Sequence, residues 1–139
     1  MRFVLAIICC KLIRLALRLM GRGGTALPGK VALRICPDML SRLARGVTVA
    51  VVTGTNGKTT TCRMLEKMLR DAGKDCFANR SGSNLERGIT ADFVSNAGLF
   101  GRPRRKLAVI ECDEAALRRV CAELDPAVCV VTNVFRDQL

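Results

Sequence analysis

A glycine-rich turn between two regular elements constrains this chain more than any other feature. Residues 51–61, VVTGTNGKTTT, pass from β-branched residues into two glycines, a lysine and three threonines. The apolar run before the turn predicts a buried strand over residues 47–53, and the pattern after it predicts a helix over residues 58–72. A glycine-rich loop that leads from a strand into a helix is typical of phosphate-binding sites.

Each residue type in this turn has a chemical reason to be there. Gly54 and Gly57 let the backbone turn its N–H groups inward, and the start of the helix adds its positive dipole end. Lys58 is placed to reach the β- and γ-phosphates of a nucleotide, and the Thr59 hydroxyl is placed to ligate Mg2+. The common G-x-x-x-x-G-K-[ST] pattern has a glycine where this chain has Val52, so Gly54 supplies the turn instead.

A carboxylate follows a second apolar run and completes the predicted site. Residues 107–111, LAVIE, indicate a buried strand whose tip places Glu111 at the carboxyl edge of a sheet, where α/β proteins bind ligands. A metal beside nucleotide phosphates needs such an acid from a neighbouring strand. Asp113 and Glu114 have another explanation, as the N-cap and first-turn acid of the next helix. We therefore favour Glu111 over these two as the metal ligand.

The remaining pattern predicts an α/β fold. Short strands are expected over residues 75–78, 107–112 and 127–131, with helices over about 89–96 and 114–124 and a polar loop over 79–87. Strands that alternate with helices form a parallel sheet with helices on both faces.

The first 46 residues differ in charge from the rest and are predicted to be a separate N-terminal unit, with residues 47–139 forming the nucleotide-binding domain. They hold nine Lys and Arg against a single acid, Asp38, within a net charge of +11. The start of the chain predicts a basic amphipathic helix with Lys11, Arg14, Arg18 and Arg22 at helical spacing, too short and charged to span a bilayer. This helix either packs on the domain with a solvated basic stripe or lies on an anionic membrane surface. A flexible connection over 21–30 and one or two short helices over 30–45 are expected to follow.

Cysteine and aromatic content narrow the partners and the compartment. The eight cysteines show no CxxC spacing and histidine is absent, which disfavours a zinc site and indicates free thiols in a reducing, cytoplasmic compartment. Because Trp and Tyr are absent, the basic charge is not accompanied by the stacking residues usual in nucleic-acid readers, and no nucleic-acid partner is expected.

The loop and four other segments resemble a known family. The sequence TGTNGKTT, residues 53–60, is typical of the Mur ligases and folylpolyglutamate synthases, which share this shortened form of the phosphate loop. Residues 21–30, 79–84, 111–115 and 132–139 (GRGGTALPGK, NRSGSN, ECDEA and TNVFRDQL) resemble, within the Mur ligases, the MurT-type subunits of lipid II isoglutaminyl synthase.

The resemblance implies an ATP-dependent amide ligase of peptidoglycan biosynthesis with a P-loop central domain. In such enzymes ATP phosphorylates the α-carboxyl of D-glutamate in the lipid II stem peptide, and ammonia comes from a glutamine amidotransferase subunit, GatD. The resemblance assigns ATP binding, Mg2+ binding and catalysis to specific positions. The phosphate-binding residues are Gly54, Thr55, Asn56, Gly57, Lys58, Thr59 and Thr60; Thr59 and Glu111 hold Mg2+, Lys58 and Glu111 are catalytic, and Asn79, Ser81 and Asn84 form a substrate-side loop.

The resemblance also predicts that this chain is incomplete at its C-terminus and inactive alone. Gln138 stands where amino-acid-adding Mur ligases often have a histidine, which favours the amidating subunit. Two alternatives remain open: another Mur-type or folylpolyglutamate ligase, and a non-catalytic ATP-binding fragment. The expected location is the cytoplasm, with the inner face of the membrane as a possible site of contact.

Overall fold

A parallel sheet forms the middle layer of the protein. The computed structural model describes residues 1–21, 24, 26–79 and 85–134. The sheet has the strand order β2-β3-β1-β4, with all pairs parallel. Its strands are β1 (Thr48–Thr53), β2 (Cys76–Ala78), β3 (Leu107–Glu111) and β4 (Val128–Val131). The connecting helices are α4 (Lys58–Asp71), α5 (Glu86–Asn96) and α6 (Glu114–Leu124).

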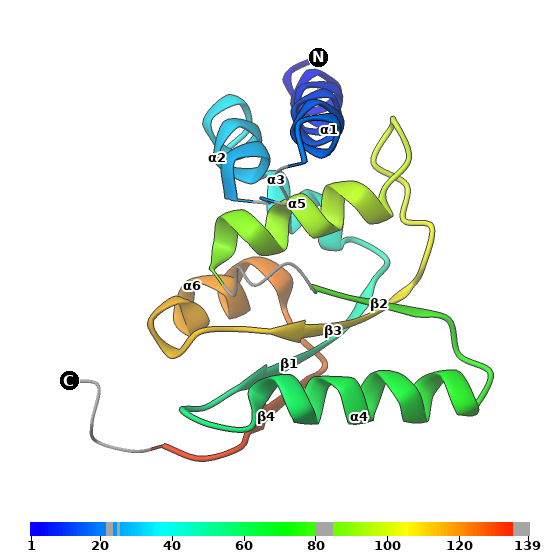
Figure 1. The fold of residues 1–139 in the computed structure, drawn as a ribbon, viewed down its shortest axis with the longest axis vertical. Coiled ribbons are helices and arrows are strands. Elements are labelled where there is room, and N and C mark those ends of the chain that lie inside the picture. Colours follow the sequence, from blue (N-terminus) through cyan, green and yellow to red (C-terminus); the bar gives the residue numbers. More distant parts are fainter. Residues whose placement is uncertain (22–23, 25, 80–84, 135–139) are drawn as a thin grey trace.

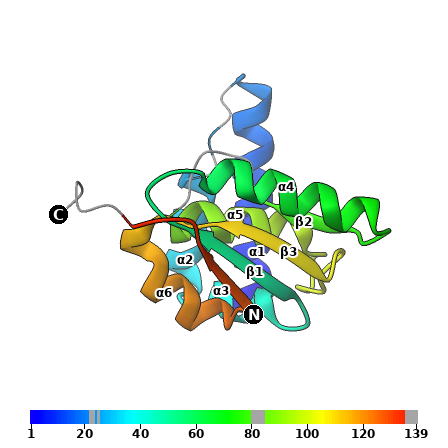
Figure 2. The same ribbon diagram turned by 90° about the horizontal axis from the view of Figure 1, so that it is seen from below.

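Helices cover both faces of the sheet, as the sequence predicted (Figures 1 and 2). Successive side chains of β1 point to opposite faces. Val51 therefore belongs to the large apolar cluster shared with α5 and α6, whereas Val52 packs with Val109 and with Cys62 of α4. Burial on both faces explains why β1 and β3 appear in the sequence as continuous apolar runs.

Three N-terminal helices form a further layer on α5 (Figure 1). They are α1 (Arg2–Leu19), α2 (Ala26–Ile35) and α3 (Met39–Ala44). Helix α5 lies between this layer and the sheet, so Ile89 and Phe93 are almost fully buried. The Phe93 ring packs edge-on against Phe77 of β2, with ring centroids 5.0 Å apart. A single hydrophobic cluster thus extends from α1 to the sheet.

The predicted flexible connection over residues 21–30 is wrong in its second half, because α2 begins at Ala26. Pro28 lies in the first helical turn, where its missing N–H has no intrahelical role. Gly29 lies against α5, and a Cβ there would collide with the carbonyl oxygen of Arg87. The glycine therefore serves a close helix–helix approach, which the sequence pattern does not distinguish from a loop.

The predicted solvated basic stripe on α1 is also wrong for two of its members. The Lys11 ammonium donates to the carbonyl oxygen of Ala97 at 2.5 Å. The Arg14 guanidinium donates to the carbonyl oxygen of Ala91 at 3.0 Å and pairs with Asp92 at 3.2 Å. These cations fasten α1 to α5, whereas Arg18 is exposed and Arg22 lies outside the described residues.

No helix in the described ranges is long and apolar enough to cross a membrane. All eight cysteines are free thiols, and five of them are buried: Cys10, Cys36, Cys62, Cys76 and Cys112. Burial raises the pKa of Cys62 and Cys112 to about 12 each, so these thiols stay protonated and pack as small apolar groups.

Candidate functional site

The glycine turn connects β1 to α4 with its helical N–H groups directed into the loop. Gly54 has φ +129° and Gly57 has φ +83°, values that glycine adopts without strain. The N–H group of Thr61 donates to the carbonyl oxygen of Gly57 at 2.9 Å. The N–H groups of residues 58–60, which precede Thr61 in the helix, have no acceptor within the helix. The first turn of α4 carries no acid. This arrangement fits an anion.

Two residues that follow β4 brace the loop from its side. The Thr55 N–H donates to the Asn133 carbonyl oxygen at 3.1 Å, and the Asn56 N–H donates to Asn133 Oδ1 at 2.9 Å. The Thr132 hydroxyl donates to the Asn56 carbonyl oxygen at 2.6 Å. A Cβ on Gly54 would stand 2.7 Å from the Asn133 carbonyl oxygen, so glycine is required there. Sequence analysis assigned no site role to Thr132 or Asn133, although a Thr-Asn pair directly after an apolar strand was a usable signal.

Lys58 folds back over the loop that it terminates. Its ammonium donates to the carbonyl oxygens of Gly54 and, at 3.4 Å, of Thr55, and lies 3.4 Å from Glu114 Oε2. Glu114's own backbone N–H, and then the Lys58 ammonium, lower the pKa of the Glu114 carboxyl. The sequence explained Glu114 only as a first-turn acid of α6, so its contact with Lys58 is a second role.

Thr59 and Glu111 meet at the carboxyl edge of the sheet. Glu111 ends β3 opposite Val52 of β1, and its side chain is mostly buried. The Thr59 hydroxyl donates to Glu111 Oε1 at 3.1 Å. Adjacent ligands of an octahedral Mg2+ at its usual ligand distance lie about 2.9 Å apart, so the two oxygens are spaced to bind one ion together. A hydroxyl and a carboxylate fit the oxygen ligation that Mg2+ prefers.

Asn79 fixes the backbone of Glu111. Its Nδ2 donates to the Glu111 carbonyl oxygen at 2.7 Å, and its Oδ1 accepts from the Glu111 N–H at 2.8 Å. The substrate-side loop role predicted for Asn79 stays a prediction, and the structure adds a structural role in which its amide pairs with the end of β3. The other two residues predicted for that loop, Ser81 and Asn84, lie outside the described residues.

The neighbouring acid Asp113 takes the position that the sequence predicted for it. It is the N-cap of α6, and its carboxylate accepts from the Ala115 N–H at 3.0 Å. The structure thus gives Asp113 a capping partner and brings Glu111, rather than Asp113, against Thr59.

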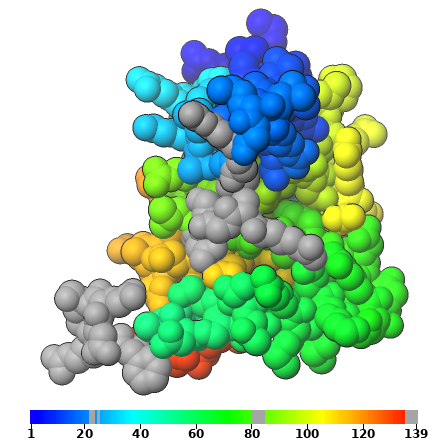
Figure 3. All heavy atoms as spheres, viewed as in Figure 1, coloured from blue at the N-terminus to red at the C-terminus, as the bar shows by residue number. Residues whose placement is uncertain are grey.

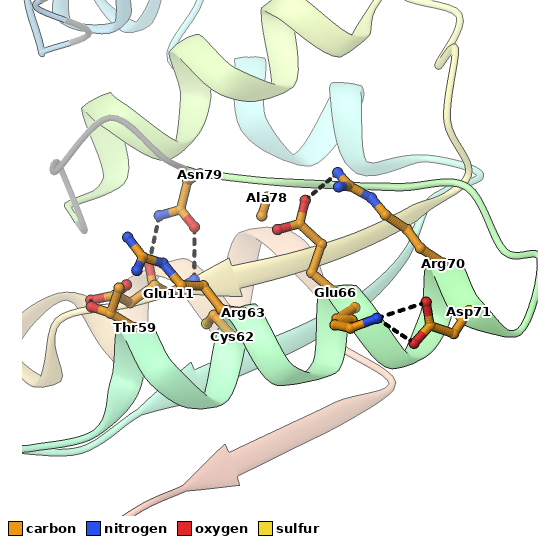
Figure 4. Close-up of a pocket in the computed structure, with 10 residues that line it drawn as sticks. Thr59, Cys62, Arg63, Glu66, Arg70, Asp71, Ala78, Asn79 and Glu111 are labelled. Atoms are coloured by element: carbon orange, nitrogen blue, oxygen red, sulfur yellow. Dashed lines mark hydrogen bonds and ion pairs between the residues drawn. The ribbon is translucent and has the colours of Figure 1, made fainter.

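A groove of about 860 Å³ extends from Thr59 and Glu111 along α4 (Figure 4). Its lining residues come from α4 and from the ends of β2 and β3: Thr59, Cys62, Arg63, Glu66, Lys67, Arg70, Asp71, Ala78, Asn79 and Glu111. Two of its cations are paired, since Arg70 contacts Glu66 at 2.6 Å and Lys67 contacts Asp71 at 2.7 Å. Arg63 has no ion-pair partner in the part of the chain that the structure describes, and Figure 4 shows it near the Thr59 end of the groove. The sequence did not indicate Arg63.

Comparison with known proteins adds a family and several relatives. Residues 52–139 match the model of the Mur ligase middle domain. The chain is 42% identical over 120 residues to the lipid II isoglutaminyl synthase (glutamine-hydrolyzing) subunit MurT of Streptococcus pneumoniae, which covers 86% of this chain and 26% of that protein. It is 40% identical over 140 residues to the same subunit of Staphylococcus aureus, covering 100% of this chain and 31% of that protein.

More distant relatives share the same region. The UDP-N-acetylmuramate–L-alanine ligase of Mycolicibacterium vanbaalenii is 36% identical over 109 residues, covering 74% of this chain and 19% of that protein. The crystal structure of MurF from Acinetobacter baumannii matches with a TM-score of 0.57 and 21% identity, over 73% of this chain and 21% of that chain, which supports the fold. The chain spans less than a third of the length of the curated relatives it matches.

Proposed function

Because the chain belongs to the Mur ligase family, we propose that residues 54–60 bind ATP and that the chain activates a carboxylate for an ATP-dependent carbon–nitrogen ligase. The observation that carries this proposal is the convergence of Lys58, Thr59 and Glu111 on the N-terminus of α4. Because the chain spans under a third of the length of its relatives, its activity is proposed from the residues of the site.

The residues of the loop supply electrostatic stabilisation rather than covalent chemistry. In the proposed reaction the substrate carboxylate attacks the γ-phosphorus of ATP, an acyl phosphate forms, and ADP leaves. Lys58 and the N–H groups at the start of α4 stabilise the negative charge on the phosphate oxygens. Thr59 and Glu111 hold Mg2+, which when bound neutralises charge on the β- and γ-phosphates. Asn79 positions Glu111 through its backbone.

We further propose that the carboxylate is the α-carboxyl of D-glutamate in lipid II and that the product is D-isoglutamine. The support is the similarity to MurT subunits, at 40–42% identity, against 36% for an alanine-adding ligase. Ammonia would then come from a partner glutamine amidotransferase subunit, GatD, in the cytoplasm. Gln138, the residue that favoured the amidating subunit in the sequence, lies outside the described residues. The division into units 1–46 and 47–139 also stays a prediction.

The ATP site is tested by comparing Lys58→Ala with Lys67→Ala. Both lysines lie on α4, but Lys67 is exposed and pairs with Asp71. Charge-assisted hydrogen bonds are worth about 1.5–3 kcal/mol, so loss of Lys58 should weaken Mg-ATP binding by roughly 10- to 100-fold. Isothermal titration calorimetry measures the affinity, and circular dichroism verifies that each variant folds. Equal affinities in the two variants would refute the site.

The substrate is tested separately through the neighbouring gene and the partner. A glutamine amidotransferase reading frame beside this gene, and binding of its product to this protein in a pull-down, are expected for the amidating subunit. A neighbouring gene for an amino-acid-adding ligase pathway, with no such binding, would favour another Mur-type ligase while leaving the ATP site intact.

A further inference from the structure

Helix α1 turns an apolar face toward solvent. Its inner face buries Ala6, Ile7 and Cys10 against the rest of the protein. Its outer face carries a straight row of exposed large apolar residues at alternating spacings of three and four: Leu5 (54% exposed), Ile8 (38%), Leu12 (60%), Leu15 (54%) and Leu19 (82%). Residues at this spacing lie along a single face of a helix. The row is about 21 Å long at 1.5 Å per residue. We call these five residues the outer stripe.

A loop beside the start of α1 adds to this apolar surface. Leu99 is 54% and Phe100 80% exposed. The next residue, Gly101, lies so close to the Phe3 ring that a Cβ on it would stand 2.5 Å away, which places the loop against α1. In the space-filling view α1 (dark blue) forms one end of the molecule, and the segment around residue 100 (yellow) lies on the same half (Figure 3).

The helices and the loop that form this surface carry only positive charges. Helices α1 and α2 and residues 97–106 contain no Asp or Glu. Their exposed cations include Arg2 and Arg18 on α1 and Arg102 and Arg104 on the loop. Burial, followed by the nearby Arg104 guanidinium, lowers the pKa of Lys11, so Arg104 lies close enough to act on α1. Apolar side chains surrounded by cations complement a surface that is apolar inside and anionic outside.

The alternative occupants fit this surface less well. A second copy of the chain would bring the same cations face to face, and like charges across an interface oppose association. The chain downstream of β4 starts from the opposite end of the molecule from α1 (Figure 1). A polypeptide partner would need a matching acidic apolar face, whereas an anionic bilayer supplies both properties without specific pairing.

We propose that the outer stripe of α1, together with Leu99 and Phe100, lies on the surface of an anionic lipid bilayer. The helix rests parallel to the membrane with its leucines in the headgroup boundary and with Arg2 and Arg18 against lipid phosphates. Lys11 and Arg14 contribute by holding α1 on α5 rather than by contacting lipid. This inference does not depend on the ligase reaction.

Vesicle binding of the full 139-residue chain tests the proposal. Sedimentation is measured with neutral phosphatidylcholine vesicles and with vesicles that contain about one third phosphatidylglycerol, at low and high salt. We expect binding to the anionic vesicles that falls at high salt, because screening weakens the attraction of Arg2 and Arg18. Absence of binding, or equal binding to both vesicle types, would overturn the proposal.

A matched pair of variants separates the stripe from general surface hydrophobicity. Leu12→Gln with Leu15→Gln changes two exposed stripe residues, and Met64→Gln with Met68→Gln changes two residues of similar exposure (61% and 64%) on α4. The leucine pair should reduce the partition coefficient by at least tenfold and retain Mg-ATP affinity, while the methionine pair and Lys58→Ala should bind vesicles normally. An equal loss of vesicle binding in both double variants would overturn the lipid assignment. So would light scattering that shows a wild-type dimer which only the leucine substitutions convert to a monomer.

Discussion

Replacing Asn79 with aspartate tests how the carboxylate beside the phosphate loop is held in place. The Asn79 side chain is buried and pairs with both backbone polar groups of Glu111, at 2.7 and 2.8 Å. Aspartate has the same shape and keeps the bond from the Glu111 N–H. Its other oxygen, when ionised, faces the Glu111 carbonyl oxygen and donates nothing. The substitution thus removes a single hydrogen bond and creates a contact between two acceptors.

The expected loss of stability follows from these two groups. A buried polar group left without its partner costs about 1–3 kcal/mol, and the buried carboxylate adds repulsion against the carbonyl oxygen. We therefore expect Asn79→Asp to lower the free energy of unfolding by about 3 kcal/mol at pH 7.5. For a chain of this size, that loss lowers Tm by roughly 10 °C. Asn79→Ala, which leaves both Glu111 groups unpaired, should lose about 2–5 kcal/mol at any pH between 5 and 8.

The aspartate variant should also acquire a pH dependence of known sign. Burial and the facing carbonyl oxygen raise the pKa of Asp in the folded state above its unfolded value of about 3.9. The folded variant then binds a proton more tightly than the unfolded chain, so its stability relative to wild type rises as pH falls. The protonated carboxyl can donate to the Glu111 carbonyl oxygen and restores the lost bond.

Urea unfolding of wild type and both Asn79 variants, at pH 7.5, 6.0 and 5.0, measures these differences. The gap between wild type and Asn79→Asp should narrow toward pH 5, whereas the gap for Asn79→Ala should stay constant. A wild-type-like aspartate variant at pH 7.5, or a gap that widens as pH falls, would refute the assigned pairing with Glu111.

Two further predictions concern the loop and the metal. In urea unfolding, Gly54→Ala should lose at least about 2 kcal/mol more stability than Gly73→Ala. Both glycines have positive φ, but of the two only Gly54 lies where a Cβ would meet backbone atoms. Equal losses would contradict this close packing. Glu111→Gln should weaken the Mg2+ dependence of ATP binding more than Asp113→Asn, since Asp113 is an N-cap; calorimetry with and without Mg2+ measures this, and the reverse order would mean that the wrong acid was chosen.

The sheet and its helices were predictable because their signals are local. β1 and β3 are continuous apolar runs, and α6 begins at Glu114 as predicted because its N-cap, Asp113, is the adjacent residue. The start of α5 at Glu86 was placed three residues late, since its first turn lies in a polar segment. The local pattern also failed to predict the start of α2. Gly29 is there because α2 packs closely against Arg87, which is distant in the sequence.

The orientation of α1 could not be read from its sequence. The helix has both an apolar row and a basic row, and either can face inward. Which row faces inward depends on the carbonyl oxygens of Ala91 and Ala97, which accept hydrogen bonds from Arg14 and Lys11. The bonded residues are 77 and 86 positions apart in the chain. No periodicity within residues 1–20 contains that information.

The centre of the site was predictable, and its supports were not. Lys58 and Thr59 follow from the motif, and Glu111 follows from its place at a strand end. Asn79, Glu114 and Asn133 contribute through the sheet register and strand order, which bring together residues that are 32 to 77 positions apart in the chain. These three residues can be assigned to the site only when the strand order, with β3 between β1 and β2, is known.

The contact between Lys58 and Glu114 has a consequence for nucleotide exchange. In the proposed ATP site an arriving phosphate would compete for Lys58 with a carboxylate that the protein itself supplies. The displaced Glu114 stays at the first turn of α6, where the positive end of the helix stabilises its charge. In the proposed reaction the same carboxylate would return to Lys58 when the spent nucleotide leaves, so the lysine would alternate between two anionic partners.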